Sequence, residues 1–76
     1  MINKRIKDVL EIISKNTGIK KNLINEKSIM SDFSKWDSIA QVKIMIELEN
    51  KIKKKISTSK ISELDSVKKI LLFLKK

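Results

Sequence analysis

The sequence predicts an all-α domain, a small bundle of three main helices and one short helix, with a long loop between the first two helices. Apolar residues recur at helical spacing in three segments, and no segment alternates apolar and polar residues as a strand does. The chain has 76 residues, which is enough for one compact domain and too few for two. We therefore expect a single domain over residues 1–76.

The first helix is expected over residues 2–15, where one face is apolar. The pattern stops before Asn16, Thr17 and Gly18, and a glycine after the last turn is a common end for a helix. The apolar face consists of Ile2, Ile6, Val9, Leu10 and Ile13.

Residues 19–36 are expected to form a long loop, because their apolar residues keep no sustained period. Loops of this length are uncommon inside a compact domain and often serve a function. We expect the loop to be held to the core at intervals by Ile19, Leu23, Ile24, Ile29, Met30 and Phe33.

The second helix is expected to begin at Asp37 or Ser38 and to end near Ile52. Asp37 is a suitable N-cap, because its carboxylate can accept a hydrogen bond from a free amide of the first turn.

Two further helical segments follow the second helix. Thr58 or Ser59 can open a short helix that runs through Ile61. Asp65 or Ser66 can cap a last helix. The residues of this last helix that are expected to face the core are Val67, Ile70, Leu71 and Leu74.

The second helix carries more apolar residues than one buried stripe requires. At about 100° per residue they form two arcs on roughly opposite sides. We expect the core arc to be Ile44, Met45, Leu48 and Ile52. The second arc, if exposed, would suit a docking partner, whereas a helix central to the fold would bury both arcs. This second arc is Ile39, Val42 and Ile46, edged by Gln41, Lys43, Glu47 and Asn50.

Composition removes most catalytic constellations. Without cysteine the chain has no disulfides and no thiolate metal sites, and without histidine it lacks the usual general base and the commonest zinc ligand. We therefore do not expect an enzyme. No apolar run approaches the roughly 20 residues that span a bilayer, and the first residues are charged rather than signal-like. We expect a soluble, cytoplasmic protein without stable membrane insertion.

The formal charge of +9 raises the question of nucleic acid or an anionic membrane as a partner. The lysines are scattered, however, and the one triplet is at residues 53–55. A nucleic-acid binder would need basic residues concentrated on one helix face, but this chain has a single arginine, Arg5. We interpret the charge as solvated surface, with a small basic nucleic-acid-binding protein as the less favoured alternative.

Ser38 is the main candidate for a functional residue. A serine at this position is often only part of a helix cap, but Asp37 can already cap this helix. A phosphate ester on the Ser38 hydroxyl would be stabilised by the free amides and the dipole of the helix. The chain has no histidine to activate the hydroxyl and no glycine-rich elbow around it, so another enzyme would have to modify it.

The residues around Ser38 resemble those of acyl carrier proteins. Asp37, Ser38 and Ile39 resemble the family's Asp-Ser-Leu motif, and the apolar residues that follow resemble its second helix. The resemblance covers the whole domain and needs no gap from Ser38 to the end. Its further matching residues are Leu23, Ile24, Ile29 and Phe33 in the first loop, Ile56, Ile61 and Leu64 in the short helix, and residues 65–74 in the last helix.

The resemblance implies that a phosphopantetheinyl transferase attaches 4'-phosphopantetheine from coenzyme A to Ser38, with Asp37 in its recognition site. The thiol of this arm would hold an acyl or aminoacyl group as a thioester. An acyl- or aminoacyl-adenylating ligase would load a monomeric carrier, and an acyltransferase or synthase would receive the cargo. The expected docking residues are Trp36, Ile39, Val42, Ile46 and Glu47, and the expected acyl pocket is Ile44, Met45, Ile56, Ile61 and Leu64.

Two departures from the family pattern favour a specialised carrier in a lipid, envelope polysaccharide or secondary-metabolite pathway. Trp36 stands where fatty-acid carriers commonly have a small residue. The usually acidic second helix contains Lys43 and Lys51, has Ala40 in place of a polar residue, and retains only Glu47 and Glu49 as acids. The alternative is a carrier-like interaction module that is never modified.

Overall fold

The structure, a computed structural model, describes residues 4–75 and the side chains of residues 6–74. Within this range it is a small all-α bundle, as predicted, and Ile2 lies outside it. The helices are α1 (Lys4–Thr17), α2 (Ser38–Ile52), α3 (Thr58–Glu63) and α4 (Val67–Lys75), and two short 3₁₀ turns, η1 (Lys21–Leu23) and η2 (Met30–Asp32), interrupt the first loop.

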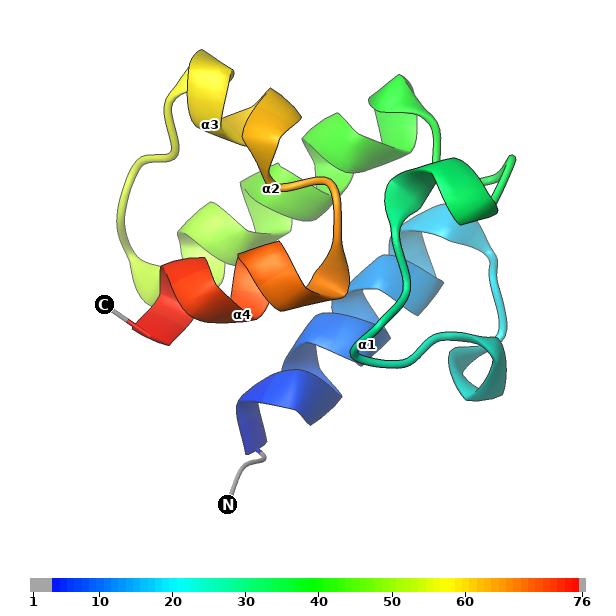
Figure 1. Cartoon of the computed structure of the whole chain (residues 1–76). Coiled ribbons are helices and arrows are strands. Elements are labelled where there is room, and N and C mark those ends of the chain that lie inside the picture. Colours follow the sequence, from blue (N-terminus) through cyan, green and yellow to red (C-terminus); the bar gives the residue numbers. More distant parts are fainter. Residues whose placement is uncertain (1–3, 76) are drawn as a thin grey trace.

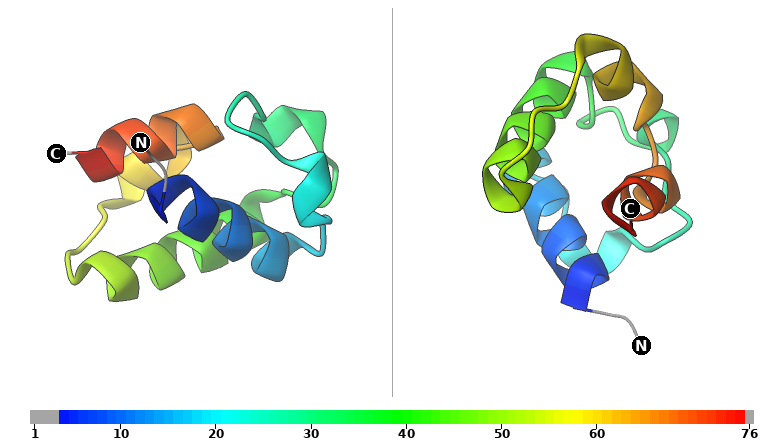
Figure 2. Two further views of the ribbon diagram at one scale, coloured as in Figure 1. Left: turned by 90° about the horizontal axis from the view of Figure 1, so that it is seen from below. Right: turned by 90° about the vertical axis from the view of Figure 1, so that its left-hand side faces the viewer.

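Helix α1 lies against both α2 and α4, and the short α3 lies against α2. Figures 1 and 2 show that the first loop closes one end of the bundle, next to the start of α4. No helix within residues 4–75 has the length and apolar character needed to cross a membrane.

Helix α1 ends at Thr17, two residues later than predicted. The last turn is polar, so apolar spacing could not reveal it. It is stabilised locally, because the side chains of Asn16 and Thr17 donate hydrogen bonds to the carbonyls of Ile12 and Ile13 at 2.8 Å and 2.7 Å. Gly18 then adopts a left-handed conformation with φ of 83°, as expected for a glycine that ends a helix.

The first loop is attached to the segment between α3 and α4 by backbone hydrogen bonds. The amide of Met30 donates to the carbonyl of Asp65 at 2.8 Å, and the amide of Val67 donates to the carbonyl of Ser28 at 3.1 Å. These bonds flank an isolated antiparallel bridge between Ile29 and Ser66. The loop is therefore held by backbone pairing as well as by apolar side chains.

The predicted apolar anchors of this loop divide into two groups. Ile19 and Ile24 are buried, and Met30 and Phe33 pack partly buried against the core. Leu23 and Ile29 were expected to be anchors, but both are exposed. Leu23 ends the η1 turn with its side chain in solvent, and Ile29 holds the loop through its backbone bridge rather than its side chain.

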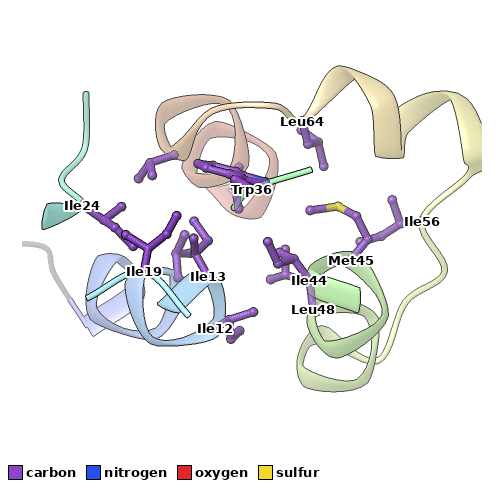
Figure 3. Packing of buried hydrophobic residues seen from close by; sticks show 13 residues of the cluster. Ile12, Ile13, Ile19, Ile24, Trp36, Ile44, Met45, Leu48, Ile56 and Leu64 are labelled. Carbon is purple, nitrogen blue, oxygen red and sulfur yellow. The ribbon is translucent and has the colours of Figure 1, made fainter. Parts of the chain in front are cut away.

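The hydrophobic core combines residues from every main helix with Trp36 from the loop. Figure 3 shows Trp36 in the middle of this cluster, with Ile19 and Ile24 on one side and Met45, Ile56 and Leu64 on the other. Its almost completely buried members are Val9, Ile13, Trp36, Ile44, Met45, Leu48, Val67 and Ile70. Burial of these apolar side chains is the main stabilising contribution to a domain of this size.

The last two helices begin with serine caps. Helix α3 begins at Thr58, with the hydroxyl of Ser57 accepting from the amide of Lys60, and it continues to Glu63, two residues beyond the predicted end. The hydroxyl of Ser66 accepts from the amide of Lys69 at 3.1 Å. In α4, the side chains of Val67 and Ile70 are fully buried and those of Leu71 and Leu74 are partly buried, as predicted.

Candidate functional site

The first turn of α2 is capped by Asp37. The Asp37 carboxylate accepts a hydrogen bond from the amide of Ala40 at 2.9 Å, and its carbonyl accepts from the amide of Gln41 at 2.8 Å. Asp37 itself has extended backbone angles, as an N-cap residue requires. The capping role is therefore filled by Asp37, and Ser38 is the first residue within the helix.

Ser38 is exposed, and its hydroxyl has no hydrogen-bond partner within residues 4–75. The amides of Ser38 and Ile39 are likewise without an acceptor in that range, as expected at the start of an α-helix. The serine hydroxyl thus lies at the positive end of a 15-residue helix with two free amides beside it. This environment suits a covalently attached phosphate group.

An exposed apolar strip begins next to Ser38. Ile39, Val42 and Ile46 are 69%, 44% and 52% exposed, and we call them the α2 strip. Of the residues predicted for the core arc, Ile44, Met45 and Leu48 are buried and Ile52 is half-buried. The two predicted arcs therefore face opposite environments, and the alternative of a helix buried on both sides is wrong. An exposed aliphatic strip of this kind is typical of a docking surface.

Trp36 was expected in the docking surface, but it is only 1% exposed. Its indole Nε1 donates a 2.7 Å hydrogen bond to Oε1 of Gln41. Gln41 was expected at the edge of the strip and is also buried, at 3% exposure. Its Nε2 donates to the carbonyls of Ile61 and Leu64 at 2.8 Å and 2.7 Å.

Periodicity could not place Trp36 or Gln41 correctly. A glutamine beside an apolar arc is expected in solvent, because a buried amide needs hydrogen-bond partners. The partners of Gln41 are an indole N–H and two carbonyls, and the carbonyls come from a distant part of the chain. The result is a buried network that joins the loop before α2, the first turns of α2 and the end of α3. We call Trp36, Gln41 and their two carbonyl partners the Trp–Gln network.

Glu47, another expected docking residue, is directed towards α1. Its carboxylate accepts from Nζ of Lys15 at 2.9 Å and from Nδ2 of Asn16 at 3.0 Å. The pKa of Glu47 is held below its ordinary value mainly by the hydrogen bonds from Lys15 and Asn16. Burial opposes this lowering, and the positive charges of Lys15 and Lys51 add to it. The negative charge of Glu47 is therefore engaged within the domain.

The expected acyl pocket is filled by its own side chains. Ile44, Met45, Ile56 and Leu64 are buried in the core, and Ile61 packs partly buried against them. Figure 3 shows Met45 pointing from α2 into the space beside Ile56 and Leu64. The structure thus brings the five residues into one cluster, and a cargo chain would have to displace side chains to enter it.

A cavity of about 560 Å³ lies elsewhere, between α1, the end of α2 and α4. Val9, Ile12 and Leu48 contribute to its wall, with Lys51 and Lys54 also lining it. Within the described part of the chain, no cluster of acidic, histidine or cysteine side chains could hold a metal ion.

No protein-family model matches the chain, and no curated protein matches it either.

Proposed function

We propose that this chain is a specialised acyl carrier protein with 4'-phosphopantetheine attached to Ser38. The observation that carries the proposal is the setting of Ser38, which is exposed and unpaired at the capped start of α2. The α2 strip beside it supplies a surface on which a modifying enzyme can dock.

In the attachment reaction, Oγ of Ser38 attacks the phosphorus nearer the pantetheine in coenzyme A. A new P–O bond forms between Ser38 and that phosphorus. The bond from the same phosphorus to the bridging oxygen of the diphosphate breaks, and adenosine 3',5'-bisphosphate leaves. The transferase supplies the base that takes the hydroxyl proton, because the chain has no histidine and no side chain of the described residues is bonded to the Ser38 hydroxyl. The amides of Ser38 and Ile39 favour the resulting negative phosphodiester.

When attached, the arm supplies a thiol that holds an acyl or aminoacyl group as a thioester. The residues of the chain then present this arm to other proteins. Ile39, Val42 and Ile46 provide the apolar contact, and the transferase, an adenylating ligase and an acyltransferase or synthase use this same surface in turn.

Shelter for a cargo chain would come from the cluster between α2 and α3. Met45 is the most adaptable residue there, because an unbranched thioether side chain can repack around a guest. The carbonyls of Ile61 and Leu64 accept hydrogen bonds from Gln41. These bonds connect the end of α3 to α2 at the edge of this cluster. Partial entry of an acyl chain would therefore be accommodated by side-chain movement on the Met45 side.

The test is the intact mass of the protein after incubation with coenzyme A and a broad-specificity phosphopantetheinyl transferase. We expect the wild type to gain one phosphopantetheine group and Ser38→Ala to gain none. Ser34→Ala is the matched control, because Ser34 is an exposed serine in the loop that precedes α2, and it should be modified like the wild type. An unmodified wild type would instead support an unmodified interaction module. A modified Ser38→Ala variant would place the attachment on another residue and overturn the assignment to Ser38.

A further inference from the structure

We propose that the α2 strip docks onto an acidic protein surface, an apolar patch flanked by carboxylates. The inference rests on the proposed function only for the identity of the partners, since the charge pattern belongs to the surface itself. It depends on which charges of α2 remain free once the internal contacts of the domain are made.

Both carboxylates of α2 are engaged inside the domain. Glu47 is bonded to Lys15 and Asn16 of α1. Glu49 is half-buried and accepts a 2.7 Å hydrogen bond from the amide of Ile56, which holds the loop after α2. At the start of the helix, the carboxylate of Asp37 caps the amide of Ala40. Each of these three acids therefore has a partner inside the domain, and Glu47 is the one that is paired with a positive charge.

Lys43 is the free charge of the strip. It is exposed and forms no ion pair with any residue in the described range. It lies four residues after Ile39 and three before Ile46, so it is next to both on the helix surface. The acid that could pair with it one turn later, Glu47, is taken by Lys15.

The positive charge of Lys43 beside the strip favours a partner with a negatively charged surface. Docking against a basic surface would bring like charges together around an apolar contact, which costs binding free energy and slows association. Docking against an acidic surface gives an attraction that speeds encounter at low salt, and the net charge of +9 adds to it.

A protein surface fits the strip better than an anionic membrane does. Interfacial membrane helices usually insert tryptophan, phenylalanine and leucine side chains along a broad apolar face. Here the single tryptophan is buried in the core, and the strip has only three aliphatic side chains. We therefore assign the strip to a protein partner and make the membrane an outcome of the test.

The test uses ¹⁵N-labelled full-length protein and two designed amphipathic helical peptides. The peptides share one leucine face and differ only in its flanking residues, glutamate in one and lysine in the other. We expect the glutamate peptide to shift the amide signals of Ile39, Val42, Lys43 and Ile46, and the lysine peptide to leave them in place. Vesicles of equimolar phosphatidylcholine and phosphatidylserine form the third arm, and they should not shift this set.

Charge-reversal variants separate a local effect from overall charge. Lys43→Glu should weaken binding of the glutamate peptide about fivefold at low salt, as expected for a charge beside a contact. Lys68→Glu is the matched control, because Lys68 is exposed on α4, has no ion pair in the described range, and changes the net charge equally. It should change binding less than twofold.

Several outcomes would overturn the inference. One is a shift of amide signals over all lysine-rich surfaces, and another is an equal loss of peptide binding in Lys43→Glu and Lys68→Glu. Tighter binding of the lysine peptide would also overturn it, as would strip signals that shift with vesicles and not with peptides. The mass measurement on Ser38 is independent of this test. If the strip prefers the glutamate peptide but Ser38 is not modified, only the carrier function is overturned. If Ser38 is modified but the strip does not prefer the glutamate peptide, only the charge inference is overturned.

Discussion

The indole Nε1 of Trp36 donates a 2.7 Å hydrogen bond to Oε1 of Gln41, and both side chains are buried. Because Gln41 also donates to the carbonyls of Ile61 and Leu64, one side chain joins three segments of the fold. Ser38 lies between Trp36 and Gln41 in the sequence. The Trp–Gln network therefore holds the start of α2, with its serine, in a defined position relative to α3.

Gln41→Leu should lower the free energy of unfolding by about 2–3 kcal/mol. The substitution preserves approximate volume but leaves the buried Trp36 N–H and the carbonyls of Ile61 and Leu64 without their partner. Urea unfolding followed by circular dichroism measures the effect. Asn50→Leu is the control, because Asn50 is exposed on the same helix, and it should change stability by less than about 0.5 kcal/mol. Equal stability of the two variants would contradict a structural role for the network.

The fluorescence of Trp36 should report a buried indole in the native protein. It is the only tryptophan of the chain and is 1% exposed, so emission should be blue-shifted and poorly quenched by acrylamide. Unfolding should shift the emission to the red and increase quenching. Strong quenching of the native protein would instead place Trp36 at the surface, where a docking role would again be open.

Asp37→Ala should destabilise the domain by about 1 kcal/mol, because it removes the acceptor for the amide of Ala40 at the start of α2. Asp37→Ser should recover most of the loss, since serine is also a good N-cap. Thermal unfolding of the three proteins measures the difference. Full stability of Asp37→Ala would show that the cap is dispensable.

Glu47→Gln should lower stability at pH 7 by no more than about 1 kcal/mol, because the interaction of Glu47 with Lys15 is largely exposed. The pKa of Glu47 is lowered on folding from an ordinary value of 4.5, so its contribution is fully present above that value. The contribution is lost as the pH falls through the lower pKa of the folded state. The variant and the wild type should therefore converge in acid.

Urea unfolding at a series of pH values measures this convergence. Glu26→Gln serves as the control, because Glu26 is exposed and has no ion pair within the described residues, and it should show no such pH dependence. A difference between Glu47→Gln and the wild type that grows in acid would contradict the lowered pKa.

Helix α2 shows what local pattern can predict. Its start, its end at Ile52 and the division of its apolar residues into two arcs all follow from helical geometry and from the capping chemistry of Asp37. The burial of Ile44 and the exposure of Ile39 on opposite sides agree with that division. The pattern alone left open whether neighbouring elements would cover the second arc, because periodicity contains no information about packing partners.

The errors concern residues whose environment comes from distant parts of the chain. Gln41 was placed in solvent, but carbonyls about twenty residues later bury it. The family resemblance placed Trp36 in the docking surface, but its side chain is buried in the core between the helices. The ends of α1 and α3 were predicted early, because polar last turns give no apolar signal.

Local sequence was sufficient to predict the all-α class, the capped start of α2 and the position of Ser38 in its first turn, because helix periodicity and capping depend on residues a few positions apart. Tertiary structure decided that the second arc of α2 stays exposed, that Trp36 and Gln41 pair in the interior, and that Glu47 and Glu49 are engaged within the domain. The physical reason is that burial and the pairing of polar groups depend on partners which only the packing of distant segments brings together.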